Sequence, residues 1–149
     1  MADTRVQLEV EDWVRREWLP TKFNQQFRRE RLRLSAGGVF DFDAVSSDNT
    51  IVANISTSSG ITSGGKNPSG KIQKLRADML FLLMVKAEKR LIVLTEKGMY
   101  DLCLKEKSNG RVPLEIEFVL VEIPEMLAAS LHNAKSIASK EVSPRDIGE

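Results

Sequence analysis

Two short strings of the sequence place polar side chains at every second position, as a strand with one polar face would. The first string holds Asp41 and Asp43 between apolar residues, and the second holds Asn54 and Ser56. Carboxylate and amide oxygens that share a strand face can bind a hard cation. The same pattern fits the solvated side of an amphipathic hairpin, so the strings alone leave both interpretations open.

Three lysines follow the second string and could bring a positive charge back to such a face. Lys66 lies in a segment rich in glycine and serine, residues 58–70, that we predict to be a flexible loop. Lys71 and Lys74 lie near the start of the next predicted helix, on one of its faces. That face also holds Asp78, and a charged helical face of this kind is usually a solvated surface.

The elements that would position these residues alternate between the strand period and the helix period. We predict a first helix over residues 6–18, which Pro20 stops or kinks because proline lacks a backbone N–H. On the strand at 39–45 we expect Phe40, Phe42 and Ala44 to share the face opposite the aspartates. Residues 98–107 fit a helix or a strand equally well. The other predicted elements are strands at 28–34, 51–57, 90–95 and 114–123, and helices at 71–86 and after Pro124.

This order of elements predicts an α/β fold with a mixed sheet flanked by helices. The short turns between the first three strands favour antiparallel pairing. The helical crossover between residues 57 and 90 favours parallel pairing of the fourth strand with the third.

The order also resembles the PD-(D/E)XK nuclease superfamily, which has the restriction-endonuclease-like fold. The resemblance covers residues 28–95, with a glycine turn, an acidic strand, a second polar strand, a loop, a helix and an apolar strand. It implies a restriction-endonuclease-like core with an aspartate on the second strand and a Glu-x-Lys or Asp-x-Lys pair on the third. In that family the carboxylates hold Mg²⁺ or Mn²⁺, and the lysine orients or activates the attacking water.

On this resemblance, Asp43 stands where the family has its aspartate. Asn54 replaces the third-strand acid and Ser56 replaces the lysine. The pair is degraded, because an amide brings no charge and a hydroxyl cannot replace an ammonium group. The implied catalytic set is Asp43, Asn54, Ser56, Lys71 and Lys74, and the implied metal ligands are Asp41 and Asp43.

Basic residues gather in the middle of a chain that is nearly neutral overall, with 22 basic and 21 acidic residues. Residues 27–34 hold four arginines against one glutamate, and residues 60–90 hold seven basic residues against two acidic ones. A local positive surface is typical of phosphate contacts, although a solvated surface shows it too. The candidate nucleic-acid-binding residues are Arg29, Arg31, Arg33, Lys66, Lys71 and Lys74.

The composition excludes several classes of site. Cys103 is the only cysteine and His132 the only histidine, which excludes an internal disulfide, a cysteine-based zinc site and most histidine-dependent catalysis. Near matches to the phosphate-loop motif at Gly60 and Gly65 lack the Ser or Thr that binds Mg²⁺, so we expect no nucleotide cofactor. Without a membrane-length apolar run or a signal peptide, we expect a cytoplasmic protein with no membrane partner.

We expect one domain over the 149 residues. Its predicted parts are a helical lead-in at 1–27, a nuclease-like core at 28–95, a strand and C-terminal helix at 96–140, and a tail at 141–149. The favoured function is binding of DNA or RNA by a nuclease-like fold with a degenerate cleavage site. One alternative is an active Mg²⁺-dependent endonuclease that uses Asp43 and a displaced lysine. The other is a non-catalytic interaction module or homodimer with Trp13, Trp18 and the C-terminal helix in its partner surface.

Overall fold

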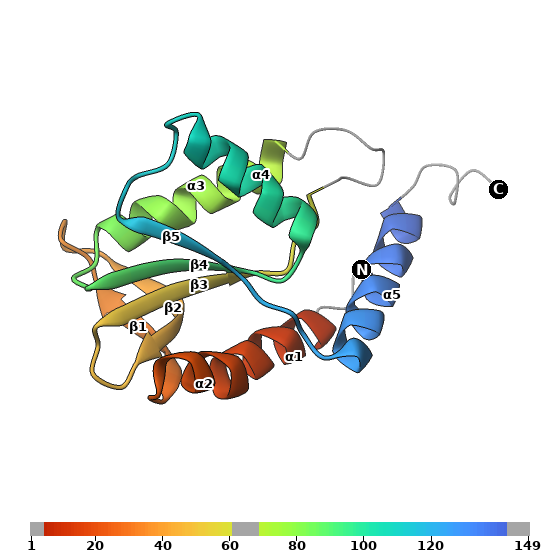
Figure 1. Ribbon diagram of the computed structural model, residues 1–149, viewed down its shortest axis with the longest axis horizontal. Coiled ribbons are helices and arrows are strands. Elements are labelled where there is room, and N and C mark those ends of the chain that lie inside the picture. Colours follow the sequence, from red (N-terminus) through yellow and green to blue (C-terminus); the bar gives the residue numbers. More distant parts are fainter. Residues whose placement is uncertain (1–4, 61–68, 143–149) are drawn as a thin grey trace.

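One mixed sheet organises the residues that the computed structural model describes, 5–60 and 69–142, and helices cover both of its faces (Figure 1). Its strands are β1 (Phe27–Arg33), β2 (Val39–Ser46), β3 (Ile51–Ser56), β4 (Lys89–Leu94) and β5 (Ile116–Leu120). The helical segments are α1 (Arg5–Trp13), the π-helical turn η1 (Val14–Trp18), α2 (Leu19–Phe23), α3 (Ser69–Leu83), α4 (Lys97–Ser108) and α5 (Glu125–Val142).

The five strands lie side by side in chain order. β1, β2 and β3 form antiparallel pairs, whereas β4 pairs parallel to β3 and β5 parallel to β4. The predicted mixed sheet is confirmed, and so is the parallel crossover through α3. Residues 61–68, which include most of the predicted loop and Lys66, lie outside the described residues.

Of the two predicted effects of Pro20, a stop or a kink, the stop is wrong, because the helical segment continues beyond Pro20. α1 passes into η1, whose wide turn lets the N–H of Leu19 donate to the carbonyl of Val14, and α2 then continues to Phe23. Pro20 lies in the first turn of α2, where its missing N–H is tolerated. Asn24, with φ of 55°, closes the helix by donating its N–H to the carbonyl of Pro20 at 2.8 Å.

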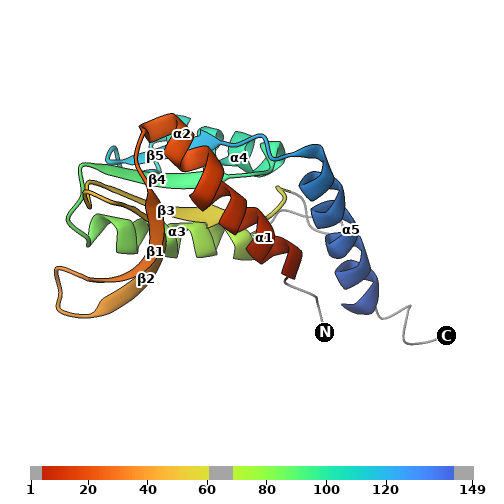
Figure 2. The ribbon, with the colours of Figure 1, turned by 90° about the horizontal axis from the view of Figure 1, so that it is seen from below.

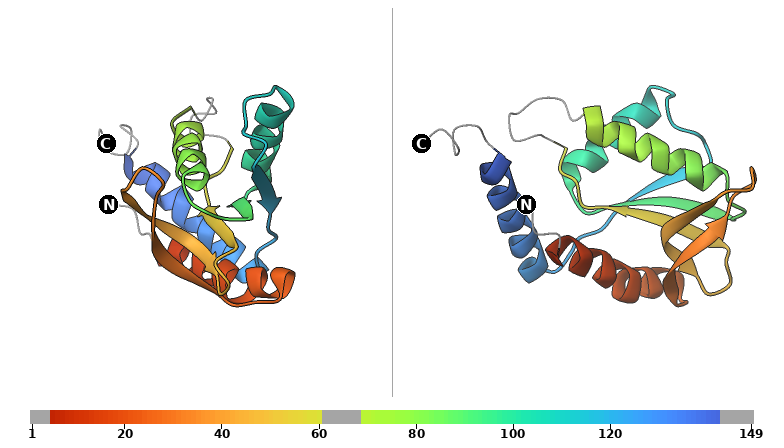
Figure 3. Two further views of the ribbon diagram at one scale, coloured as in Figure 1. Left: turned by 90° about the vertical axis from the view of Figure 1, so that its left-hand side faces the viewer. Right: turned by 180° about the vertical axis from the view of Figure 1, so that it is seen from behind.

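The sheet separates two hydrophobic cores. Figure 3 shows the helices on opposite faces of the sheet. α3 and α4 cover one core, which includes Ile92, and the N-terminal helices cover the other, which includes Leu91. β4 supplies alternate residues to both cores, which explains its nearly all-apolar sequence. Trp13 and Trp18 are half-buried against the second core. They contribute to packing within the chain and leave less apolar surface for a partner than the sequence suggests.

β2 contains a β-bulge beside Asp43. The strand register places two β2 residues, Asp43 and Ala44, opposite the single β1 residue Arg29. The prediction that Phe42 and Ala44 share a face is therefore wrong, because Phe42 packs under α3 and Ala44 packs in the opposite core. The extra residue rotates the strand, and a period-two pattern in the sequence does not reveal such a rotation.

Beyond the bulge, the β1–β2 hairpin turns away from β3 and reaches the C-terminal end of α3 (Figure 2). Its tip is attached there, because the N–H of Ser35 donates to the carbonyl of Met84 at 2.7 Å. Phe40 stacks on Phe81 of α3 with ring centroids 4.3 Å apart. β2 and β3 consequently separate beside Asp43.

The segment that the sequence left unassigned is the helix α4. Its buried stripe consists only of Met99 and Cys103, which gives a weak periodic pattern. α5 follows Pro124, as predicted, and packs beside α1 with Leu131 buried (Figure 1). Within the described ranges, no helix is both long and apolar enough to cross a bilayer.

Gly60 packs directly on the start of α4, and we expect Gly60→Ala to lower the free energy of unfolding by about 1 kcal/mol. A Cβ at this position would lie 2.4 Å from the carbonyl carbon of Gly98 and 2.7 Å from the nitrogen of Met99. Urea denaturation measures the loss. Gly70→Ala in α3 is the matched control, because a Cβ there meets no atom within 4 Å. Equal losses in the two variants would contradict the close contact.

Candidate functional site

Asp43 and Asn54 meet where β2 and β3 separate. The backbone N–H of Asp43 donates to Oδ1 of Asn54 at 3.3 Å, and the N–H of Ile55 donates to Oδ2 of Asp43 at 2.8 Å. These side-chain bonds follow directly after the last backbone-paired residues, Ala44 and Ala53. The structure therefore brings together two of the residues that the sequence singled out, and both hold the diverging strands to each other.

Asn54 is buried, with 3% of its surface exposed. The N–H of Asp43 fixes the orientation of the amide, because the opposite orientation would set one donor against another. Nδ2 of Asn54 then has no hydrogen-bond partner among the described residues. A buried donor without an acceptor costs free energy, and an NH₂ group is not a ligand for a cation.

Two further carboxylates, on helices that cover opposite faces of the sheet, interact electrostatically with Asp43. Burial raises the pKa of Glu11 on α1, and the charge of Asp43 raises it further. Burial likewise raises the pKa of Asp78 on α3, with a smaller contribution from Asp43. Arg15, Arg29 and Lys74 oppose the shift of Glu11, and Lys74 opposes that of Asp78. We call Glu11, Asp43, Asn54, Lys74 and Asp78 the Asp43 group.

Arg15 of η1 holds the N-terminal helical segment against the bulge. Its Nε donates to the backbone carbonyl of Asp43 at 2.6 Å, and its Nη1 lies 3.3 Å from Oδ1 of Asp12. Glu11 lies one helical turn before Arg15, so the same contact sets the position of Glu11 relative to Asp43. The sequence analysis missed Glu11, since nothing in the sequence connects the first helix to the acidic strand.

Asp41 is not part of the Asp43 group. Its carboxylate accepts two hydrogen bonds from Arg31, one from Nε at 3.0 Å and one from Nη2 at 3.3 Å. These bonds lower the pKa of Asp41. Because the bulge follows Asp41, the two aspartates have different partners, and the structure does not bring them together as a pair of ligands.

The candidate lysines also have different neighbours from one another. Nζ of Lys74 lies 3.8 Å from the carboxylate of Asp78, so Lys74 is the candidate lysine that joins the Asp43 group. Lys71, one turn earlier, points to the end of β3, where its Nζ lies 3.3 Å from Oγ of Ser59. Lys66 lies outside the described residues.

The donors around Asp43 do not fit the Mg²⁺ or Mn²⁺ site that the resemblance implies. Oδ2 of Asp43 already accepts a bond from Ile55, and Asn54 has its NH₂ group unpaired. Ser56 is half-buried at the end of β3, and its Oγ accepts a bond from the N–H of Ser58 at 3.3 Å. Among the described side chains, no three carboxylate, histidine or cysteine groups are placed to hold one metal ion.

Arg29, Arg31 and Arg33 share one exposed face of β1, as the sequence predicted. β1 is an edge strand, and no other strand of the described residues pairs with its outer edge. Arg31 is paired with Asp41, whereas no carboxylate in the described part of the chain lies within ion-pair distance of Arg29 or Arg33. We call these three residues the arginine face.

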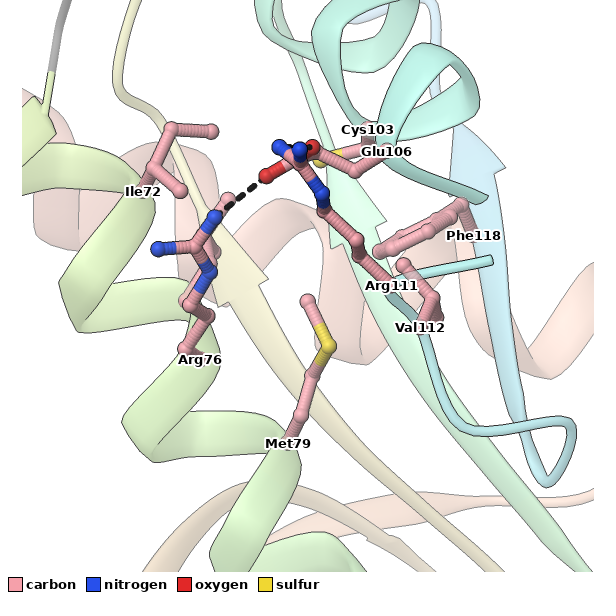
Figure 4. A pocket seen from close by; sticks show the side chains of 9 residues that line it. Ile72, Arg76, Met79, Cys103, Glu106, Arg111, Val112 and Phe118 are labelled. Carbon is pink, nitrogen blue, oxygen red and sulfur yellow. Dashed lines mark hydrogen bonds and ion pairs between the residues drawn. The ribbon is translucent and has the colours of Figure 1, made fainter. Parts of the chain in front are cut away.

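A small pocket between α3 and α4 is separate from the Asp43 group (Figure 4). Cys103 and Phe118 lie in its lining, and Glu106 pairs with Arg76 and Arg111 at its rim. Burial, with a smaller contribution from Glu106, raises the pKa of the Cys103 thiol to about 11. The thiol is therefore protonated at neutral pH and is a poor nucleophile.

Comparisons of the chain with models of protein families, with curated proteins and with solved structures gave no match. The function must therefore be inferred from the side chains themselves. Two features stand out, the Asp43 group where β2 and β3 diverge and the arginine face on the neighbouring edge strand.

Proposed function

We propose that this chain binds the phosphate backbone of DNA or RNA through the arginine face and does not cleave it. The observation that carries the proposal is the exposed row of Arg29, Arg31 and Arg33 on an open edge strand. Guanidinium groups bind phosphate oxygens through paired hydrogen bonds, and each contact releases counterions from the nucleic acid. Arg29 and Arg33 supply most of the binding, because Asp41 already neutralises Arg31.

The architecture supports a restriction-endonuclease-like core within this proposal. The helix, the three antiparallel strands, the crossover helix and the parallel fourth strand follow the order on which the resemblance was based. Asp43 on β2 lies beside Asn54 on β3, the two strands on which the family has its acidic residues. The arginine face adjoins this point, because Arg29 lies opposite Asp43 in the register.

The chemistry of the Asp43 group supports binding without cleavage. Asn54 supplies no charge where the resemblance implies an acid, and Ser56 supplies no ammonium group. Lys74 faces a carboxylate, Asp78, that it helps to neutralise. We derive no catalytic step for this group.

Reversing the charge at two arginines tests the proposal. The double variant Arg29→Glu, Arg33→Glu is expected to weaken binding to a DNA duplex and to reduce the slope of log affinity against log salt by about 2, since each lost phosphate contact removes about one counterion. Fluorescence anisotropy over a range of KCl concentrations measures both quantities. Lys105→Glu with Lys107→Glu is the matched control, because both lysines are exposed on α4, outside the arginine face. An unchanged salt slope in the arginine variant would contradict the proposal.

The contact of Asp43 with Asn54, on the two strands where the family has its acidic residues, favours the second candidate, an active endonuclease. The charge of Asp43 also raises the pKa of Glu11 and of Asp78. Plasmid nicking in the presence of Mn²⁺ distinguishes the two functions. We expect no nicking by the wild type. Nicking that disappears in Asp43→Ala would establish the endonuclease and would make Lys74 the next residue to replace.

A further inference from the structure

A second group of charged residues lies at the carboxyl ends of β3 and β4. Lys135 of α5 donates from its Nζ to the carbonyl of Thr57 and lies 2.8 Å from Oε1 of Glu96. Lys71 of α3 reaches the same place, with its Nζ 3.3 Å from Oγ and 3.4 Å from the carbonyl oxygen of Ser59. We call Lys71 and Lys135 the lysine pair.

Glu96 pairs with Lys135, and no described carboxylate pairs with Lys71. The side chains of Lys135 and Glu96 are 24% and 34% exposed, so the charges are partly removed from water. Burial lowers the pKa of Lys71, the charge of Lys135 lowers it further, and Glu96 opposes these effects only in part. The cluster therefore holds one positive charge in excess, in a place where an anion interacts more strongly than on an open surface.

The surroundings of the lysine pair suit an oxyanion with several acceptor oxygens. Residues 56–59 all carry hydroxyl groups and are half-buried, and a hydroxyl can donate to a phosphate oxygen. The carboxyl ends of parallel strands are also where open α/β sheets commonly bind ligands. Within the described residues, the contacts of Lys71 with Ser59 are long, so the three donors of its ammonium group are not all used there.

We propose that Lys71 and Lys135 bind a phosphate group at the carboxyl ends of β3 and β4. The molecule that carries this phosphate is inferred from the proposed function, since it would be the nucleic acid that also contacts the arginine face. Lys74 lies between the two regions, because it is one helical turn from Lys71 and also belongs to the Asp43 group. A bound strand would thus contact a series of cations on both sides of Asp43.

Two measurements on the full chain test the phosphate site. Inorganic phosphate is titrated into ¹⁵N-labelled protein, and the signals of the lysine Nζ groups and of the Ser59 amide are followed by NMR. We expect saturable shifts that Lys71→Gln abolishes and Lys71→Arg retains. In duplex binding, Lys71→Gln is expected to reduce the salt slope by about 1, as loss of one phosphate contact would. Lys107→Gln, at an exposed position of α4, is the control for both measurements.

The outcomes separate this inference from the proposed function. If phosphate shifts the NMR signals of the lysine pair but the chain binds no duplex, the phosphate site is supported as a site for free phosphate. The proposed function then fails. If the arginine variants weaken duplex binding but phosphate shifts neither lysine, the phosphate site is refuted and the proposed function stands. NMR shifts that persist in Lys71→Gln would also refute the phosphate site.

Discussion

Asn54→Glu is expected to lower the free energy of unfolding by about 3 kcal/mol at neutral pH when no divalent metal is present. The new carboxylate would lie at a position that is 3% exposed, directly beside Asp43. A buried charge without a partner costs several kcal/mol, and a neighbouring carboxylate of the same sign adds to that cost. Urea denaturation measures the loss. Asn54→Gln is the control, because it has the size of glutamate without its charge.

The same substitution provides a direct test of the nuclease-like arrangement. Glutamate at this position restores the third-strand acid, so Mn²⁺ should stabilise Asn54→Glu more than it stabilises the wild type. Ser56→Lys in addition restores the full pair. The extra stabilisation by Mn²⁺ should disappear when Asp43→Ala is combined with Asn54→Glu. A response that survives the loss of Asp43 would show that the two positions do not share a site.

Much of the fold could be predicted from the sequence because its signals are local. Alternating polar and apolar residues indicate β1 and β2, and the run of buried residues Leu91 to Leu94 indicates a strand covered on both faces. The parallel pairing of β3 with β4 follows from the helix between them, since a hairpin cannot connect parallel strands. The resemblance implied that Asp43 and Asn54 belong to one site, and the two residues are hydrogen-bonded to each other.

The parts that could not be predicted depend on contacts between distant residues. The bulge that moves Ala44 to the opposite core is an adjustment of strand twist, and no residue type marks it. Pro20 lies within a helical segment because a π-helical turn precedes it. The charge of Asp43 acts on Glu11 and Asp78 only because two helices pack on opposite faces of one sheet. From the sequence, Asp78 is simply the i+4 partner of Lys74.

Asp78→Asn is expected to raise the free energy of unfolding by about 1 kcal/mol at neutral pH. Burial, with repulsion from Asp43, raises the pKa of Asp78 above its usual value of 3.8. The folded state therefore binds this proton more tightly than the unfolded state does, and ionisation of Asp78 costs stability above the raised pKa. The gain in Asp78→Asn should shrink as the pH falls through the raised pKa and should vanish near 3.8. Urea denaturation at a series of pH values measures this profile.

Asp101→Asn is the matched control for this experiment. Both aspartates follow a lysine by four residues, but the Asp101 side chain is 55% exposed and the Asp78 side chain is 15% exposed. Loss of the exposed pair with Lys97 should lower stability by less than about 0.5 kcal/mol, without the pH-dependent gain. If Asp78→Asn instead destabilises the protein at neutral pH, the carboxylate stabilises the Asp43 group. That result would show that repulsion among the acids does not govern the Asp43 group. The buried Nδ2 of Asn54, which has no partner among the described residues, would then be the next group to study.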